Sequence, residues 1–392
     1  MTSFTRIFFC LLLIFGLGGC ERQSGKDNQA VGRSDSHKLF RVDSVKIKID
    51  DATNYRNNYQ QLIIDSIADR EHLAILNTNV NKVIVFDLSS KEQVYQIQFK
   101  DVGKNGVGKR IRGFYLLNQD SLFLMSTLAC RVFLVSREGI KLRTYDICQS
   151  GATSNPSGLT RAPLFMIGKF LYMPAHPNVR ADGDFWTHKL FIELDVLSGQ
   201  VRHLFTPPAD FEGKSWGVYH HHHTYAMNNK KEVIHNFTFD ENLYVRRLTE
   251  DKEFMVVPAA SRHFRQIEPW QAGSIDPFMS GDEEFYITSN SYKSILWDPW
   301  RHVYYRFAER GVDLLDESGM RRDWTDKGLS VIILDSALKI IGETDLRDDS
   351  YFIGDSFVTS RGLHISANHE KNKRLEEKFL KFDVFELSAV DN

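Results

Sequence analysis

The sequence predicts an all-β protein, a six-bladed β-propeller with seven blades as the alternative, and three observations lead to this prediction. Short runs rich in β-branched and aromatic residues recur along the chain, and each is interrupted by an Asp or Ser in a tight polar turn. Successive turns lie roughly 40 to 60 residues apart, a spacing typical of propeller blades. Aromatic residues form 12% of the chain, which favours packing between sheets over a helical bundle.

Six copies of this repeat are expected to form the blades. The clearest copy is SILWDPWRHVYYRF at 294–307, where Pro299 suits a turn between two strands. A turn carboxylate accepts hydrogen bonds from the backbone N–H groups just ahead of it, and a serine does so more weakly. The residues expected in this role are Asp87, Ser136, Asp195, Asp240, Asp298 and Asp335. With one turn residue in each blade, we expect the blades at about 58–100, 111–147, 160–206, 217–249, 283–310 and 328–387. A strand at 39–49 is expected to join the last blade and close the ring.

The N-terminus predicts export and a lipid anchor. Arg6 precedes an apolar stretch at 7–17 that is too short to remain as a membrane span. The following Leu-Gly-Gly-Cys resembles the bacterial lipobox, in which Cys20 carries the lipid, although an ordinary secretory signal with a chance cysteine is the alternative. We therefore expect a signal peptide at 1–19, a flexible tether at 20–38 and one propeller domain at 39–392. The domain would lie outside the cytoplasm, anchored in the cell envelope and most simply in the outer membrane.

Two cysteines remain in the predicted domain. Cys130 and Cys148 flank a predicted hairpin almost symmetrically, so they would lie opposite one another across it. An oxidising envelope permits a disulfide there, and two unpaired buried thiols are the alternative.

The lipobox, the loop GKNGVG at 103–108, the Asp turns and the segment WDPWRHVYYRF together carry a resemblance. The chain resembles a family of Bacteroidota lipoproteins, domain-of-unknown-function family 4221, which is related to six-bladed TolB-like and NHL-like propeller lipoproteins. The resemblance spans nearly the whole mature chain and implies the fold and the location. Its motifs are structural, so it implies no activity and no catalytic residue.

Net charge and one loop sequence argue against nucleic acid and nucleotides as partners. The formal net charge of −2 gives no reason to expect nucleic acid. The loop at 103–109 matches the start of a phosphate-binding loop, but Arg110 stands where Ser or Thr should bind magnesium and a strand is predicted next. We therefore expect no nucleotide, and the glycines are explained by an interblade loop.

The most distinctive polar feature is the run of four histidines, His220, His221, His222 and His223. On a strand, His220 and His222 would share one face and the other two the opposite face. One such pair could bind zinc with His176 or His235, but the spacing places no acidic third ligand. The simpler interpretation is packing and hydrogen bonding, so we expect no metal and no other cofactor.

A predicted insertion at 176–188 carries His176, Asp182 and Asp184 in a long loop of the third blade. Such loops often line the ligand surface of a propeller, although a solvated turn is the simpler interpretation. Together with His220–His223, these residues form the candidate ligand surface, which we expect at one end of the central channel.

These patterns predict a lipid-anchored, extracytoplasmic binding module. Its partners would be the membrane, through the lipid, and an envelope protein or a glycan. One alternative is a propeller enzyme, such as a lactonase or a glycan lyase or hydrolase, with its site at the channel mouth. Another is a structural subunit of an envelope complex. No catalytic residue can be assigned from the sequence, and an enzyme is the less favoured alternative.

Overall fold

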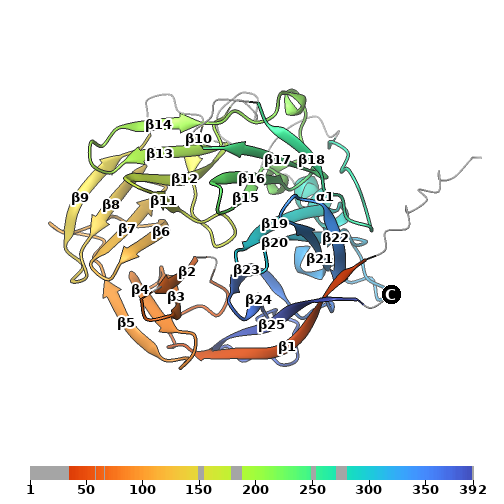
Figure 1. Ribbon diagram of the computed structural model, residues 1–392, viewed down its shortest axis with the longest axis horizontal. Coiled ribbons are helices and arrows are strands. Elements are labelled where there is room, and N and C mark those ends of the chain that lie inside the picture. The colour runs from red at the N-terminus through yellow and green to blue at the C-terminus, as the bar shows by residue number, and fades with distance from the viewer. Residues whose placement is uncertain are drawn as a thin grey trace, which may run out of the picture. The chain divides into compact units, whose positions relative to one another are not determined.

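The computed structural model describes residues 35–57, 59–65, 67–148, 154–177, 188–248, 253–270 and 280–390. These residues form six antiparallel sheets arranged in a ring, as Figure 1 shows. The all-β, six-bladed prediction is therefore confirmed, and the seven-bladed alternative is not.

The chain builds the blades in order, and within each blade the strands are paired with their neighbours. Blade 1 contains β2 (Gln60–Asp65), β3 (Arg70–Asn77), β4 (Lys82–Asp87) and β5 (Gln93–Gln98). Blade 2 contains β6 (Ile111–Asn118), β7 (Ser121–Ser126), β8 (Arg131–Val135) and β9 (Lys141–Asp146). Blade 3 contains β10 (Ser154–Pro156), β11 (Phe165–Ile167), β12 (Phe170–Pro177), β13 (Phe191–Asp195) and β14 (Val201–Leu204).

The second half of the ring follows the same plan. Blade 4 contains β15 (His223–Met227), β16 (Glu232–Phe237), β17 (Asn242–Arg247) and β18 (Met255–Pro258). Blade 5 contains β19 (Ser291–Asp298), β20 (Val303–Arg310), β21 (Gly328–Asp335) and β22 (Ile340–Asp345). Blade 6 contains β23 (Phe352–Thr359), β24 (Gly362–Ser366), β25 (Phe379–Ala389) and the N-terminal strand β1 (His37–Lys48).

The pairing of β1 with β25 closes the ring. The two strands are antiparallel, from His37 opposite Ala389 to Lys48 opposite Phe379. The first strand of the domain is thus the outermost strand of the last blade, visible in red beside the dark blue β25 in Figure 1. This confirms the expected closure.

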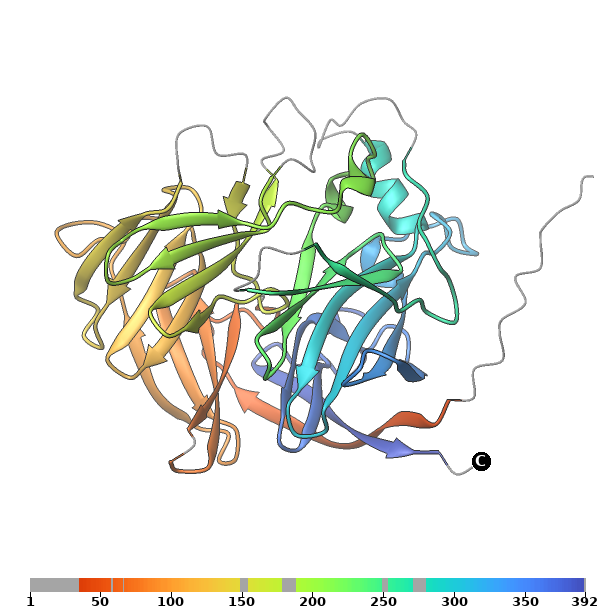
Figure 2. The ribbon, with the colours of Figure 1, turned by 45° about the horizontal axis from the view of Figure 1, so that its top comes forward.

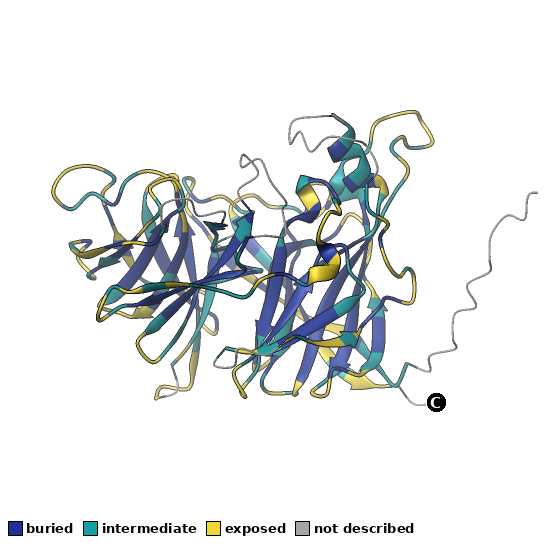
Figure 3. Ribbon diagram, turned by 90° about the horizontal axis from the view of Figure 1, so that it is seen from above, coloured by how far each residue is buried: buried dark blue, intermediate teal, exposed yellow. Residues whose placement is uncertain are grey.

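Apolar side chains fill the spaces between neighbouring blades. The described residues contain six buried apolar clusters, and each joins strands of two adjacent blades. Middle strands such as β4 are buried along nearly their whole length because both of their faces meet another sheet. Outer strands such as β9 are mostly exposed, and Figure 3 shows this contrast between buried strands and exposed loops.

The expected turn residues do close turns, but they do not mark one blade each. Asp87, Asp195, Asp298 and Asp335 each accept hydrogen bonds from two backbone N–H groups ahead of them. Asp298 ends β19 and Asp335 ends β21, so both belong to blade 5. The expected boundary between the fifth and sixth blades was therefore wrong. An insertion at 311–327 separates the two hairpins of this one sheet and made them resemble two blades.

Short helices gather at one end of the ring. The helix α1 (Ser280–Thr288), which the sequence analysis did not predict, lies next to the 3₁₀ helix η3 (Val218–His220), as Figure 2 shows. The buried Asp282 of α1 accepts hydrogen bonds from the Val218 N–H, which fixes the two helices together. None of the helices in the described part of the chain has the length and apolar composition needed to cross a membrane.

Candidate functional site

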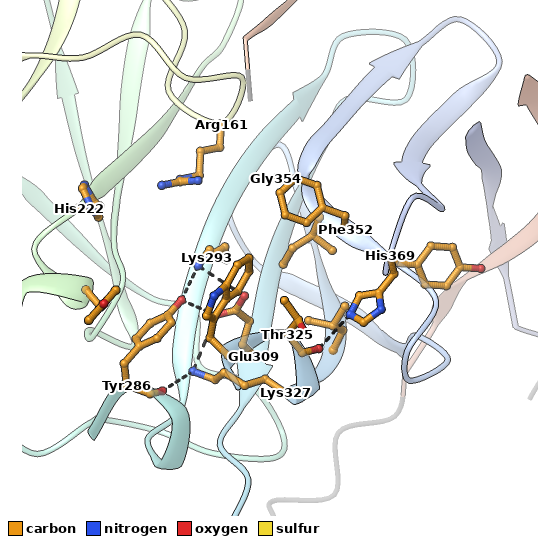
Figure 4. A pocket seen from close by; sticks show the side chains of 15 residues that line it. Arg161, His222, Tyr286, Lys293, Glu309, Thr325, Lys327, Phe352, Gly354 and His369 are labelled. Atoms are coloured by element: carbon orange, nitrogen blue, oxygen red, sulfur yellow. Dashed lines mark hydrogen bonds and ion pairs between the residues drawn. The ribbon is translucent and has the colours of Figure 1, made fainter. Parts of the chain in front are cut away.

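A cavity of about 310 Å³ lies between blade 5, blade 6 and the helices α1 and η3. We call it the basic cavity because its described lining residues include three basic side chains, Arg161, Lys293 and Lys327, and one carboxylate, Glu309. Figure 4 shows these groups facing one another across the cavity. The remaining lining residues are Tyr219, His222, Tyr286, Trp324, Thr325, Leu329, Tyr351, Phe352, Ile353, Gly354 and His369.

Glu309 is the centre of a buried ionic network. Its carboxylate accepts hydrogen bonds from the hydroxyls of Tyr286 (3.0 Å) and Ser291 (2.5 Å). The ammonium groups of Lys293 and Lys327 lie 3.7 and 3.8 Å from it. Burial raises the pKa of Glu309, but the two ammonium groups and the two hydroxyls outweigh this effect and leave its pKa lowered. Glu309 is therefore ionised at neutral pH.

The two lysines reach the network by different local structures. A β-bulge between Tyr292 and Ser294 takes Lys293 out of the regular ladder with β20 and directs its side chain into the cavity. Its ammonium bonds the Tyr286 hydroxyl and lies above the rings of Tyr286 and Trp324. Lys327 follows the 3₁₀ helix η4 (Trp324–Asp326), which a capping box at Asp323 holds in place.

Lys327 is almost fully enclosed, with 1% of its side chain exposed. Its ammonium donates hydrogen bonds to the Tyr286 carbonyl and the Ser291 hydroxyl, both at 3.0 Å. Burial lowers the pKa of Lys327 to about 7, and the attraction of Glu309 opposes that effect. Burial likewise lowers the pKa of Lys293.

Arg161 adds a third cation, which interacts electrostatically with the carboxyl groups of Glu309 and Asp355 but contacts neither directly. It lies on the loop between β10 and β11, close to an isolated bridge between Leu159 and Ala162. Its guanidinium makes no hydrogen bond or ion pair with any residue that the structure describes. Figure 4 shows it extending toward the space between His222 and Lys293. Burial lowers its pKa, but an arginine remains charged in a protein. Among the described lining residues, positive charges thus outnumber negative ones.

Aromatic rings form much of the cavity wall. Tyr219 and Tyr286 are stacked with ring centroids 5.4 Å apart, and Trp324 lies edge-on to Phe352 at 6.3 Å. Tyr219 is 43% exposed, so this part of the wall is open to solvent. Flat apolar rings beside cations suit a ligand that has both an apolar face and a negative charge.

Two further cavities adjoin the basic cavity. One, of about 500 Å³, which we call the surface cavity, shares His222 with it and is also lined by Arg110, Arg112 and His176. The other, of about 410 Å³, shares Arg161 with it and is lined by residues of all six blades, so it lies in the central channel. The basic cavity therefore adjoins the channel at Arg161 and a second cavity at His222.

The four consecutive histidines do not lie on one strand, so the expected alternation was wrong. Gly217 adopts a positive φ of 75° and begins η3, which contains His220, and only His223 belongs to β15. The rings that meet are instead His222 and His176, with centroids 4.6 Å apart. His223 lies between His176 and His235, at 5.9 and 5.8 Å.

The structure places the other predicted residues as follows. His220 bonds the Ser289 hydroxyl at 2.9 Å, away from the surface cavity, whereas His176, His221 and His222 line that cavity. Asp182, Asp184 and Cys20 lie outside the described residues. Within the described ranges, no group of three or more His, Cys, Asp and Glu side chains is arranged to hold a metal ion.

Cys130 and Cys148 are joined by a disulfide, with Cα atoms 5.6 Å apart. Cys130 lies in the turn before β8 and Cys148 follows β9, so the bond joins the two open ends of this hairpin. The geometry therefore agrees with the predicted disulfide and not with two unpaired thiols.

Sequence reasoning missed the four charged residues of the basic cavity. Lys293 and Glu309 lie in strands rich in apolar and aromatic residues, but Ser294 and Arg306 in the same strands make this signal weak. Lys327 and Arg161 lie beside strands, in segments without any motif. Their convergence depends on the closure of the ring, which local patterns do not encode.

The fold and the cavity define a six-bladed propeller with a basic, aromatic-walled site beside its channel. Residues 36–345 match the domain of unknown function DUF4221, and the chain belongs to this family. A DUF4221 family member from Bacteroides vulgatus has a similar crystal structure. It is 22% identical, with 91% of this chain and 100% of that chain covered, and a TM-score of 0.78. A putative exported protein from Bacteroides fragilis is 13% identical, with 92% and 97% covered and a TM-score of 0.51. No curated protein sequence matches this chain.

Proposed function

We propose that this protein is a binding module that takes a small anionic, ring-containing ligand in the basic cavity. The observation that carries the proposal is the guanidinium of Arg161, which faces the cavity without a partner among the described residues. A partly buried guanidinium without a hydrogen-bond partner is costly, and an anionic ligand would compensate it with charge-assisted hydrogen bonds. Glu309 is already shared by two lysines and two hydroxyls, so it leaves Arg161 to the ligand.

The lining also supports a ligand with an apolar face. The rings of Tyr219, Tyr286 and Trp324 stand beside the cations, and the cavity volume falls in the range of small-molecule sites. A carboxylate, sulfate or phosphate group would bind Arg161 and Lys293 while its ring lies against the aromatic wall.

The ligand test compares matched charged and neutral probes. Binding of galacturonate, benzoate, inorganic phosphate and sulfate would be measured calorimetrically at low salt, against galactose and benzamide as neutral counterparts. We expect at least one anion to bind and its neutral counterpart to bind much more weakly, with affinity falling as salt rises. Arg161→Ala should weaken binding by about ten- to a hundredfold, the value of one or two hydrogen bonds to a charged group.

The matched control is Arg137→Ala, because Arg137 is exposed and lines none of the three cavities. It should leave the affinity unchanged. Equal binding of anions and neutral analogues, or an Arg161→Ala variant with the affinity of the wild type, would contradict the proposal.

We also propose that the module is held outside the cytoplasm by a lipid on Cys20. The Leu-Gly-Gly-Cys sequence supports this, and the printed description of the Bacteroides fragilis relative as a putative exported protein agrees with export. Cys20→Ser should move the protein from the membrane fraction to the soluble fraction, because the acyl chains that would hold it are no longer attached. A Cys20→Ser protein that still sediments with membranes would show that the anchor is something else.

A further inference from the structure

The surface cavity beside the basic cavity has the features of a second binding position for the same ligand. The two cavities share His222, and the segment 218–222 lines both. A ligand in the basic cavity therefore has a neighbouring space of about 500 Å³ into which it can extend.

The surface cavity is also basic. Arg110 and Arg112 line it, and no Asp or Glu is among its described lining residues. Arg112 donates a hydrogen bond to the Tyr59 hydroxyl at 3.0 Å, which orients it, whereas Arg110 makes no hydrogen bond or ion pair with a described residue. Arg110 has a positive φ of 61° in the loop before β6, a conformation that it shares with several turn residues of this chain.

Two imidazole rings meet at the boundary of the cavities, because His222 lines both and His176 lies against it in the surface cavity. Both ring nitrogens of His176 and the Nδ1 of His222 are buried at the cavity without a hydrogen-bond partner among the described residues. Burial lowers the pKa of His222 to about 3 and the pKa of His176 as well, with nearby charges such as Arg161 adding to the effect. A neutral imidazole offers one donor and one acceptor, which matches a hydroxyl group of a ligand.

We infer that the two cavities together bind an acidic oligosaccharide of at least two sugar units, an inference that rests on the proposed function of the basic cavity. One acidic unit would lie against the aromatic wall with its carboxylate at Arg161. The next would bring its negative charge to Arg110 and Arg112, with hydroxyls at His176 and His222. An acidic peptide would also carry repeated charges, but it lacks the hydroxyls that the neutral imidazoles fit and the ring faces that stack on tyrosine and tryptophan.

The test compares chain lengths on one set of variants. Monomers and fragments of two to four units from pectate, alginate and hyaluronate would be titrated into the wild-type protein, with glutamate peptides of equal length as the alternative ligand. We expect one acidic saccharide series to bind at least about tenfold more tightly as an oligomer than as its monomer. An Arg110→Ala/Arg112→Ala variant should remove this gain and leave monomer binding unchanged. Arg110→Glu alone should do the same without disturbing the Tyr59 contact, and Arg161→Ala should weaken monomer and oligomer alike.

The outcomes separate the two proposals. Two outcomes would overturn the second binding position while leaving the Arg161 site in place. One is that oligomers bind no more tightly than monomers. The other is that the tighter binding of oligomers persists in both the Arg110→Ala/Arg112→Ala and the Arg110→Glu variants. A gain for glutamate peptides and none for saccharides would overturn the ligand class. Failure of every acid to bind would overturn both proposals. A thermal melt of each variant, expected to match that of the wild type, establishes that the substituted surface residues have not unfolded the protein.

Discussion

Asp298 illustrates how much a turn residue gains from its surroundings. Besides the N–H groups of Trp300 and Arg301, its carboxylate accepts hydrogen bonds from the Arg301 guanidinium (3.2 Å) and the Tyr305 hydroxyl (3.1 Å). The residue is fully buried. Asp335 occupies the equivalent place in another hairpin of the same blade but accepts only from the N–H groups of Ala337 and Lys339.

The comparison predicts different costs for the same substitution. Asp298→Ala should lower the free energy of unfolding by about 3 to 5 kcal/mol, because it leaves buried donors, one of them charged, without their acceptor. Asp335→Ala should cost about 1 kcal/mol, the value of a local hydrogen bond. Denaturant unfolding of both variants checks this, and equal losses would mean that the buried contacts of Asp298 contribute little.

A second residue-scale prediction concerns acid stability. His235 is fully buried among the rings of Phe191, Phe205 and Phe254, and neither of its ring nitrogens has a hydrogen-bond partner in the described structure. Burial, and to a smaller extent Arg246, lowers the pKa of His235 to about 3. As the pH falls, His235 is therefore protonated in the unfolded chain before it is protonated in the folded chain. The stability contributed by the neutral, buried His235 is complete above about pH 6.5 and is lost as the pH falls toward 3.

Replacing His235 by leucine removes this group from the titration. Relative to the wild type, the His235→Leu variant should gain about 3 kcal/mol in unfolding free energy between pH 7 and pH 4, at about 1.4 kcal/mol per pH unit below the unfolded-state pKa. Unfolding curves at several pH values would measure the difference. A difference that stays constant with pH would show that His235 is protonated equally easily in the folded chain.

At the residue scale, the sequence predicts roles that depend on neighbouring residues. It does not predict which side chains from separate blades come together. The carboxylate turns at Asp87, Asp195 and Asp335 follow from chemistry within a few neighbouring residues. The grouping of Arg161 with Lys293, Lys327 and Glu309 does not, because these side chains come from blade 3 and from three segments of blade 5. The meeting of His176 with His222 likewise depends on how blades 3 and 4 pack.

At the scale of elements, the disulfide joins the two open ends of the hairpin formed by β8 and β9 in blade 2. The sequence separation of the two cysteines is 18 residues, and a bond that closes such a loop restricts the unfolded chain by about 3 kcal/mol. A Cys130→Ser/Cys148→Ser variant should be less stable by about that amount under oxidising conditions. Denaturant unfolding with and without a reducing agent provides the check. Reduced wild type should match the variant, and a loss that persists under reduction would point to packing rather than to the covalent bond.

Strands were predictable where a run of high β-propensity ends in a clear turn. They were not predictable where a glycine with a positive φ or an insertion interrupts the run. Strand pairs such as β19 and β20 combine strong β-propensity with a clear turn, so their positions follow from the sequence. The four histidines resemble a strand by composition, yet the positive φ of Gly217 starts a helical turn just before them. The insertion at 311–327 divides blade 5 into two separated hairpins, and sequence spacing alone could not show that they share a sheet.

At the scale of the whole molecule, six sheets stabilise one another through the apolar clusters between them. Each cluster joins two adjacent blades, so no sheet has both of its faces covered until its two neighbours are in place. A propeller was predictable because the blades share strand and turn chemistry, but the predicted repeats placed two turn residues in blade 5 and none in blade 6. The positions of the basic cavity and the surface cavity were not predictable, because their lining residues come from loops and short helices of separate blades.

The pairing of β1 with β25 also has a consequence for how the protein is made. The strand that leaves the ribosome first, at His37–Lys48, waits for its hydrogen-bonding partner until the last strand, Phe379–Ala389, has been synthesised. Until then β25 is missing, and the ring stays open with an unpaired strand edge that can associate with other chains. Contacts between such distant segments also form slowly. A protein exported through a membrane would therefore emerge with its ring open, and completion of the domain would follow release of its final residues.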